Sequence, residues 1–215
     1  MTVTEVPDER WDAALDAVGA VAGDRRAVYA DLATRHAAPG RHHHDLAHAS
    51  AVVDAVLGLH STGDDWASTV VAAWFHDVVH DPTAPPGTNE GASAVLATRA
   101  LQSMGCTLTA TAEVSRLICL TAHHDPPPGD RNGALLVDAD LSVLAATDED
   151  YDAYVAAVRA EYAHLDDDTW RAGRRAVLLG FLDRPTIYRT LPGRERWESR
   201  ARINISSELS TLGAR

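Results

Sequence analysis

Histidine and aspartate recur in four short clusters, each inside or beside an apolar stretch of the chain. The clusters are RHHHDLAH (41–48), HDVVHD (76–81), TAHHD (121–125) and DADL (138–141). An ionised carboxylate on an apolar face is costly unless a hydrogen bond or a metal ion compensates it. Imidazole and carboxylate without thiolate form a ligand set suited to Mn²⁺, Fe²⁺, Co²⁺, Zn²⁺ or Mg²⁺. The clusters therefore indicate a site for a divalent metal ion, and their number leaves open whether one or two ions bind.

The spacing within two clusters brings candidate ligands together. His44 and His48 are four residues apart, so they share a face if both are helical. If Asp45 is the N-cap of the helix, His44 lies just outside the helix. The spacing then does not determine whether His44 can bind the same ion as His48. His76 and Asp77 are adjacent, about 100° apart around a helix, so both can reach one ion that lies between their directions.

Helices are expected to position these residues, because apolar residues recur at three-to-four spacing along nearly the whole chain. The segment LLVDADLSVLAA (135–146) also alternates like a strand, although Val137, Leu141 and Leu144 favour a helix. No repeat or interior linker marks a boundary, so we predict one all-α domain over residues 1–215. Helices are expected near 11–18, 28–36, 46–59, 66–80, 89–105, 109–124, 135–146, 150–162, 168–184 and 197–212, with Asp45, Asp64 or Asp65, and Thr147 as N-caps.

The bulk composition narrows the class of protein. The chain has 215 residues, 46% hydrophobic and 23% charged, which is typical of a soluble globular domain. It starts without a basic and apolar leader, has no apolar run of membrane-spanning length, and has only two cysteines, not in a CxxC pattern. We therefore expect a reduced, cytoplasmic protein that does not enter a membrane.

The net negative charge and the absence of lysine argue against several classes of function. The formal net charge of −12 argues against general nucleic-acid binding, which needs a basic surface. All 19 basic residues are arginine, so the chain has no P-loop lysine, Schiff-base lysine or lysine general base. Arginine must therefore neutralise any bound phosphate, and guanidinium suits this because it pairs with phosphate through two parallel hydrogen bonds.

The order of the candidate ligands resembles that of a known superfamily. His48, the doublet His76-Asp77 and Asp140 follow the H…HD…D order of the HD-domain metal-dependent phosphohydrolases. The chain is most similar to a bacterial branch of predicted metal-dependent HD phosphohydrolases. There, RHHHDLAH resembles RHYHxLxH, AAWFHDVVHDP resembles AAWFHDxVYDP, and TNEGAS resembles DNExxSA. The resemblance covers residues from about 8 to 212 and implies a compact helical bundle of the HD-domain type that holds one or two metal ions.

The resemblance also implies roles for particular residues. His43 and His80 stand where that branch has tyrosine. Asp138 competes with Asp140 for the last ligand position, and we favour Asp140 because the superfamily's last ligand usually precedes a leucine, here Leu141. By position, the first ion would bind His48, His76, Asp77 and Asp140; His44 and His124 would bind a second ion or the substrate phosphate, and with Asp77 they form the expected catalytic set.

The implied chemistry is hydrolysis of a phosphate ester. A divalent ion can lower the pKa of its water from about 15.7 towards roughly 7, giving hydroxide that attacks phosphorus near neutral pH. Asp81 or Glu90 would orient the histidine ligands, although Asp81 could equally begin the turn before Pro82. The expected phosphate-binding residues are Arg41, Arg159, Arg174 and Arg202.

We therefore expect a phosphohydrolase whose substrate is a small phosphate ester such as a nucleotide. An HD-fold di-iron oxygenase is an alternative, because His44, His80 and His124 could serve a second iron. A nucleotide- or metal-binding regulator without turnover is another. A homodimer is possible, since the amphipathic helices could bury their faces within one chain or between two.

Overall fold

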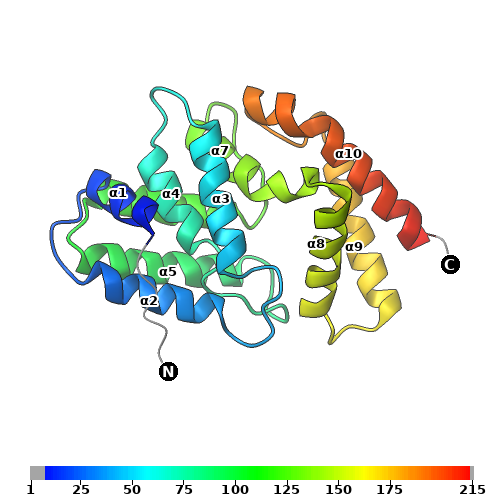
Figure 1. Ribbon diagram of the computed structural model, residues 1–215, viewed down its shortest axis with the longest axis horizontal. Coiled ribbons are helices and arrows are strands. Elements are labelled where there is room, and N and C mark those ends of the chain that lie inside the picture. The colour runs from blue at the N-terminus through cyan, green and yellow to red at the C-terminus, as the bar shows by residue number, and fades with distance from the viewer. Residues whose placement is uncertain (1–7, 214–215) are drawn as a thin grey trace.

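Helices and their connecting loops make up the whole of the described chain, residues 8–213 of a computed structural model, and no strand occurs among these residues (Figure 1). The all-α prediction is confirmed. Residues 1–7 and 214–215 lie outside this description, so the expected absence of a leader stays a prediction. The elements are α1 (Glu9–Ala17), α2 (Arg25–His36), α3 (Leu46–Leu59), α4 (Trp66–Phe75), α5 (Thr88–Ser103), α6 (Leu108–Leu120), α7 (Arg131–Asp140), the 3₁₀ helix η1 (Leu141–Ala145), α8 (Asp148–Glu161), α9 (Asp167–Leu182) and α10 (Leu191–Gly213).

Side-chain caps fix where several helices begin. Asp45 accepts a hydrogen bond from the backbone N–H of His48 at 3.0 Å, which confirms it as the N-cap of α3. Of the two candidates before α4, Asp65 is the cap. Thr147 caps α8 as expected. Within residues 8–213, no helix combines the length and the apolar character that crossing a membrane requires.

Helix α4 lies at the centre of the larger of two hydrophobic clusters. Every residue of α4 from Ala67 to Phe75 is buried, which explains why this stretch is apolar apart from Ser68 and Thr69. Helices α1, α3, α6 and α7 pack around it, and Trp11, Val53, Leu117 and Leu136 are buried in the same cluster. The ligand doublet His76-Asp77 follows α4 directly, so the core fixes its position.

Helix α4 ends at Phe75, whereas the sequence pattern predicted a helix to about His80. The guanidinium of Arg41 donates to the carbonyl oxygens of Asp77 at 2.6 Å and Val78 at 2.9 Å. Ser93 accepts from the backbone N–H of Val79 at 3.0 Å. Because these groups find partners outside the helix, the chain can leave α4 without burying unsatisfied backbone.

The segment 135–146 is helical, as α7 followed by η1, and it joins the two hydrophobic clusters. Its Val137 and Leu144 belong to the second cluster, with Ile187, Tyr188 and Ile205. Helices α8, α9 and α10 stand on the opposite side of the molecule from α1, α2 and α5 (Figure 1). A cavity lined by residues of both sides opens between them, next to the end of α7.

Candidate metal centre

Four predicted ligands converge at one point. Near the N-terminus of α3, His48 directs Nε2 to within 3.2 Å of Asp140 Oδ1, at the end of α7. His76 Nε2 lies 3.3 Å from His48 Nε2, 3.5 Å from Asp140 Oδ1 and 2.8 Å from Asp77 Oδ2. Asp77 Oδ2 is 3.6 Å from His48 Nε2. Helices α3 and α7 and the turn after α4, far apart in the sequence, thus contribute two imidazoles and two carboxylates to one site.

These separations fit a single metal ion. Ligand atoms about 2.1 Å from one ion lie about 3.0 Å apart in an octahedron and about 3.4 Å apart in a tetrahedron. The five separations here run from 2.8 to 3.6 Å. His48, His76 and Asp77 therefore form a group that could hold a metal ion, and Asp140 Oδ1 places a fourth ligand atom beside it.

The local electrostatics also favour a cation. His76 Nδ1 lies 2.8 Å from the carbonyl oxygen of Ala73, so its N–H is held there and Nε2 faces the carboxylates. Burial by itself raises the pKa of the Asp77 and Asp140 carboxyls, but the positive charge of His76 lowers both below their ordinary values. Burial likewise lowers the pKa of His76, and the two carboxylates raise it well above its usual range. The carboxylates thus require positive charge between them.

Asp138 stabilises the fold and is not part of the ligand cluster, unlike Asp140. Its fully buried carboxylate accepts from the backbone N–H of Arg189 at 2.6 Å and from the N–H and hydroxyl of Thr190, both at 2.7 Å. These donors saturate the carboxylate and fasten the start of α10 to α7. Of the two competing aspartates, only Asp140 reaches the ligand cluster.

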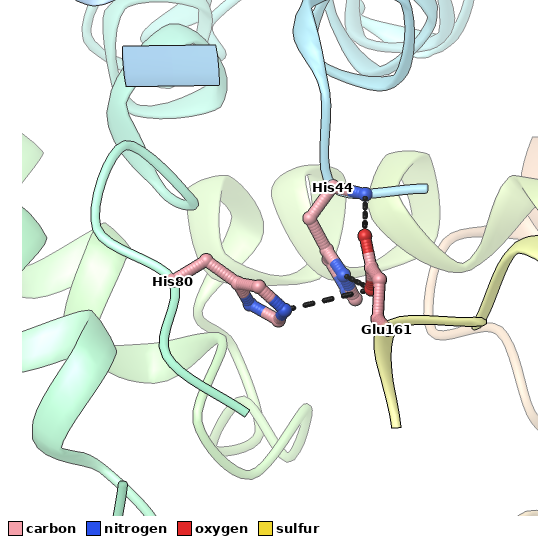
Figure 2. Close-up of side chains that lie close together, drawn as sticks. All are labelled: His44, His80 and Glu161. Carbon is pink, nitrogen blue, oxygen red and sulfur yellow. Dashed lines mark hydrogen bonds and ion pairs between the residues drawn. The ribbon is translucent and has the colours of Figure 1, made fainter. Parts of the chain in front are cut away.

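A second group of side chains lies beside the first. His44 Nδ1 is 2.6 Å from Glu161 Oε2, and His80 Nε2 is 3.5 Å from the same oxygen (Figure 2). Glu161 Oε1 accepts from three consecutive backbone N–H groups, those of residues 42–44, at 2.8 to 3.0 Å. The rings of His44 and His80 stack with centroids 4.2 Å apart. This trio is also a group that could hold a metal ion.

Sequence reasoning missed Glu161. A signal existed, because Tyr154, Val158 and Glu161 follow one another at four- and three-residue spacing on one face of α8. A glutamate on that buried stripe needs compensation for the same reason as Asp77. Burial raises the pKa of its carboxyl, but the hydrogen bond with His44, the nearby His80 ring and the backbone N–H donors lower it below its ordinary value.

His124 contacts the first group through Asp140. Its Nε2 lies 2.8 Å from Asp140 Oδ2, the oxygen that faces away from His48 and His76. His124 has a φ of 48°, a left-handed backbone conformation, and Arg184 donates to its carbonyl oxygen at 2.8 Å. The structure therefore places His124 where it can orient a ligand.

Most of the predicted phosphate-binding arginines are engaged with the fold. Arg41 binds the turn after α4. Arg159 donates to the carbonyl oxygens of Tyr162 and Leu165, and Arg202 donates to those of Leu182 and Arg184. Of the four, only Arg174 lines the cavity.

Arg174 itself is already paired. Its guanidinium binds the Glu208 carboxylate at 2.7 and 3.0 Å and the Tyr154 hydroxyl at 3.1 Å. Both members of the ion pair are buried. The cavity therefore contains no unpaired guanidinium among these four candidates.

The cavity has a volume of about 560 Å³ and two kinds of lining. The polar lining includes the metal-site residues His76, Asp77 and Asp140, together with His44, His80 and His124. Aromatic side chains from α8, from its C-cap and from α9 form one wall: Tyr154, Tyr162, Trp170 and Phe181. The polar residues suit the polar group of a ligand, and the aromatic wall suits an aromatic or apolar group of the same ligand.

Asp81 and Glu90, which were expected to orient the histidine ligands, form no hydrogen bond with them within residues 8–213. Asp81 Oδ1 accepts from the N–H and hydroxyl of Thr83 at 2.8 and 2.7 Å, which makes it part of the turn that begins before Pro82. Glu90 lines the cavity, and its buried Oε2 has no hydrogen-bond partner within the described residues. No hydrogen bond or ion pair joins either carboxylate to His48 or His76 in the described part of the chain.

Comparisons with known proteins give no relative for this chain. Protein-family models, curated proteins and solved structures were all searched, and none matches.

Proposed function

We propose that the protein is a metal-dependent phosphohydrolase that cleaves a small phosphate ester such as a nucleotide. The observation that carries the proposal is the convergence of His48, His76, Asp77 and Asp140 in one cluster, of which His76, Asp77 and Asp140 line a cavity. The order of these residues along the chain, which resembles that of the HD-domain phosphohydrolases, supports the same reading.

The residues of the site would have different roles in the reaction. His48, His76, Asp77 and Asp140 would hold a divalent ion, which when bound would supply a nucleophile at neutral pH and positive charge for phosphate oxygens. His124 keeps Asp140 in its orientation through the 2.8 Å contact. His44 lines the cavity with its Nδ1 fixed by Glu161, so its ring can face a bound phosphate as a hydrogen-bond donor.

The aromatic wall favours a substrate with a planar or apolar group. Tyr162 and Trp170 lie with ring centroids 5.6 Å apart on the cavity wall. The base of a nucleoside leaving group, or the ring of an aromatic leaving group, can stack against such surfaces. We expect aromatic and nucleoside monophosphates to be cleaved in preference to small aliphatic phosphates.

Phosphate release tests the proposal. The purified chain is supplied with Mn²⁺ and a panel of nucleoside monophosphates and p-nitrophenyl phosphate. We expect metal-dependent release that falls at least a hundredfold in His76→Ala and Asp77→Asn, while the exposed His60→Ala serves as the matched control. Full turnover in either ligand variant would contradict the proposal.

A di-iron oxygenase is the second candidate, because His44, His80 and Glu161 form another ligand group in the same region of the structure. Oxygen uptake by the reduced iron-loaded protein, without phosphate release, would favour it. A regulator without turnover would instead show a nucleotide-dependent rise in melting temperature and no release of phosphate.

A further inference from the structure

We propose that His44, His80 and Glu161 bind a second divalent cation of their own, next to the ion at His76. This inference goes beyond the hydrolase proposal, because cation binding here does not depend on which reaction the protein catalyses. It assigns a site to residues that the chain order of the HD-domain ligands does not include, namely His80 and Glu161.

The ligand atoms are gathered around one oxygen. Glu161 Oε2 lies 2.6 Å from His44 Nδ1 and 3.5 Å from His80 Nε2, and Figure 2 shows both nitrogens directed at it. Ligands of one ion lie about 3.0 to 3.4 Å apart, so small side-chain shifts would complete the site. The ion would take the place of the proton that His44 Nδ1 donates to Glu161.

His80 supplies an independent indication of a ligand. Its side chain is 9% exposed, and its Nε2 is buried with no hydrogen-bond partner within the described chain. The 3.5 Å contact with Glu161 is longer than an ordinary N–H···O hydrogen bond. Because buried polar atoms normally have a partner, a nitrogen lone pair aimed at a buried carboxylate indicates a cation between them.

Glu161 is held in position for this role. Three backbone N–H groups fix Oε1, so the carboxylate cannot turn away and Oε2 remains directed at the histidines. The Glu161 side chain is fully buried, and its Oε2 pairs with the His44 ring at 2.6 Å. Because a first ion would be shared by Asp77 and Asp140, a second divalent cation would compensate the charge of Glu161 in place of the His44 proton.

The ligand types indicate the class of ion. Two imidazoles and one carboxylate suit Mn²⁺, Fe²⁺, Co²⁺ or Zn²⁺ better than Ca²⁺, which prefers oxygen ligands throughout. The second ion would also lie at the side of the cavity where His43, His44 and His80 contribute to the lining. It would thus share the cavity with the first ion.

Manganese binding tests the inference. The full chain, stripped with chelator, is titrated with Mn²⁺, and bound metal is measured by elemental analysis and electron paramagnetic resonance. We expect two Mn²⁺ per chain and a spectrum broadened by coupling between neighbouring ions. His80→Phe and Glu161→Gln should each retain one Mn²⁺, with at least tenfold weaker binding of the other, and the spectrum of an isolated ion. His60→Ala is the matched histidine control and should retain two.

The outcomes separate the two sites. His76→Ala should lose the first ion and keep the second. One uncoupled Mn²⁺ in the wild-type chain, lost in His76→Ala and unchanged in His80→Phe, would overturn the second site and leave the first intact. Two ions that persist in both His80→Phe and Glu161→Gln would also overturn it. Absence of any bound Mn²⁺ would overturn both sites, and because the wild-type spectrum is itself diagnostic, a variant that fails to fold does not block the test.

Discussion

The two oxygens of Asp140 face different histidines: Oδ1 lies 3.2 Å from His48 Nε2, and Oδ2 lies 2.8 Å from His124 Nε2. One carboxylate thus joins the candidate metal ligands to a residue on the loop after α6. A hydrogen bond to the outer oxygen of a ligating carboxylate fixes its orientation. His124 is therefore expected to act on the metal through Asp140.

Replacing His124 should weaken metal binding without removing a ligand. We choose His124→Asn, because asparagine tolerates the left-handed backbone at this position, φ 48°, while its shorter side chain cannot reach Asp140. The expected loss is about 10- to 100-fold in Mn²⁺ affinity, measured by calorimetric titration. The exposed neighbour His123→Asn is the control and should bind as the wild type does. Equal affinities in the two variants would contradict this role of His124.

Asp138 and Asp140 should respond oppositely to the same change. Asp138→Asn places an amide against three donors, from Arg189 and Thr190, so we expect a loss of about 3 kcal/mol in unfolding free energy with the metal affinity kept. Asp140→Asn should abolish high-affinity Mn²⁺ binding while leaving the fold intact. Urea unfolding in chelator measures the first effect, and metal titration measures the second. Loss of metal binding in Asp138→Asn, without unfolding, would reverse the assignment.

Local sequence patterns predicted the parts of the site that depend on single helices. Asp45 as N-cap sets where α3 begins, and this places His48 in its first turn on the buried face. Apolar residues all around α4 indicated a buried helix, so the His76-Asp77 doublet that follows it had to be compensated. These features arise from short-range spacing, which a single sequence displays directly.

Long-range hydrogen bonds account for what the patterns did not predict. Arg41 ends α4 early by binding carbonyls 36 and 37 residues away, and no helical period contains that information. Glu161 meets His44 across 117 residues. The pairing of Arg174 with Glu208 also depends on how α9 and α10 pack, so its charge, which suggested phosphate binding, is balanced within the fold.

Arg174 should therefore contribute to stability. Its side chain is 7% exposed and that of Glu208 is 6% exposed, so Arg174→Ala would leave a buried carboxylate without its partner. We expect a loss of about 3 to 5 kcal/mol in unfolding free energy, against little change for the exposed Arg26→Ala. The double variant Arg174→Met/Glu208→Leu should recover most of that loss, since it removes both charges. A stable Arg174→Ala protein with a raised KM for a phosphate ester would instead assign Arg174 to substrate binding.

His36 should make the fold sensitive to mild acid. Its Nε2 lies 3.3 Å from the carbonyl oxygen of Trp74, and its Nδ1 lies 3.5 Å from the Arg41 guanidinium, an arrangement that suits a neutral ring. Burial, and then the charge of Arg41, lowers the pKa of His36 to about 4. The unfolded chain therefore takes up this proton at higher pH, near 6.5, and acid favours unfolding.

The stability that neutral His36 provides is complete above about pH 6.5 and falls by up to about 1.4 kcal/mol per pH unit towards pH 4, or roughly 3 kcal/mol in all. His36→Gln keeps a donor for Trp74 and an acceptor for Arg41 but cannot be protonated. Urea unfolding between pH 7.5 and 4.5 should show a shallower pH dependence in this variant than in the wild type. Some slope should remain, because burial also lowers the pKa of His43. Identical slopes in the two proteins would mean that His36 is not the group whose protonation unfolds the chain.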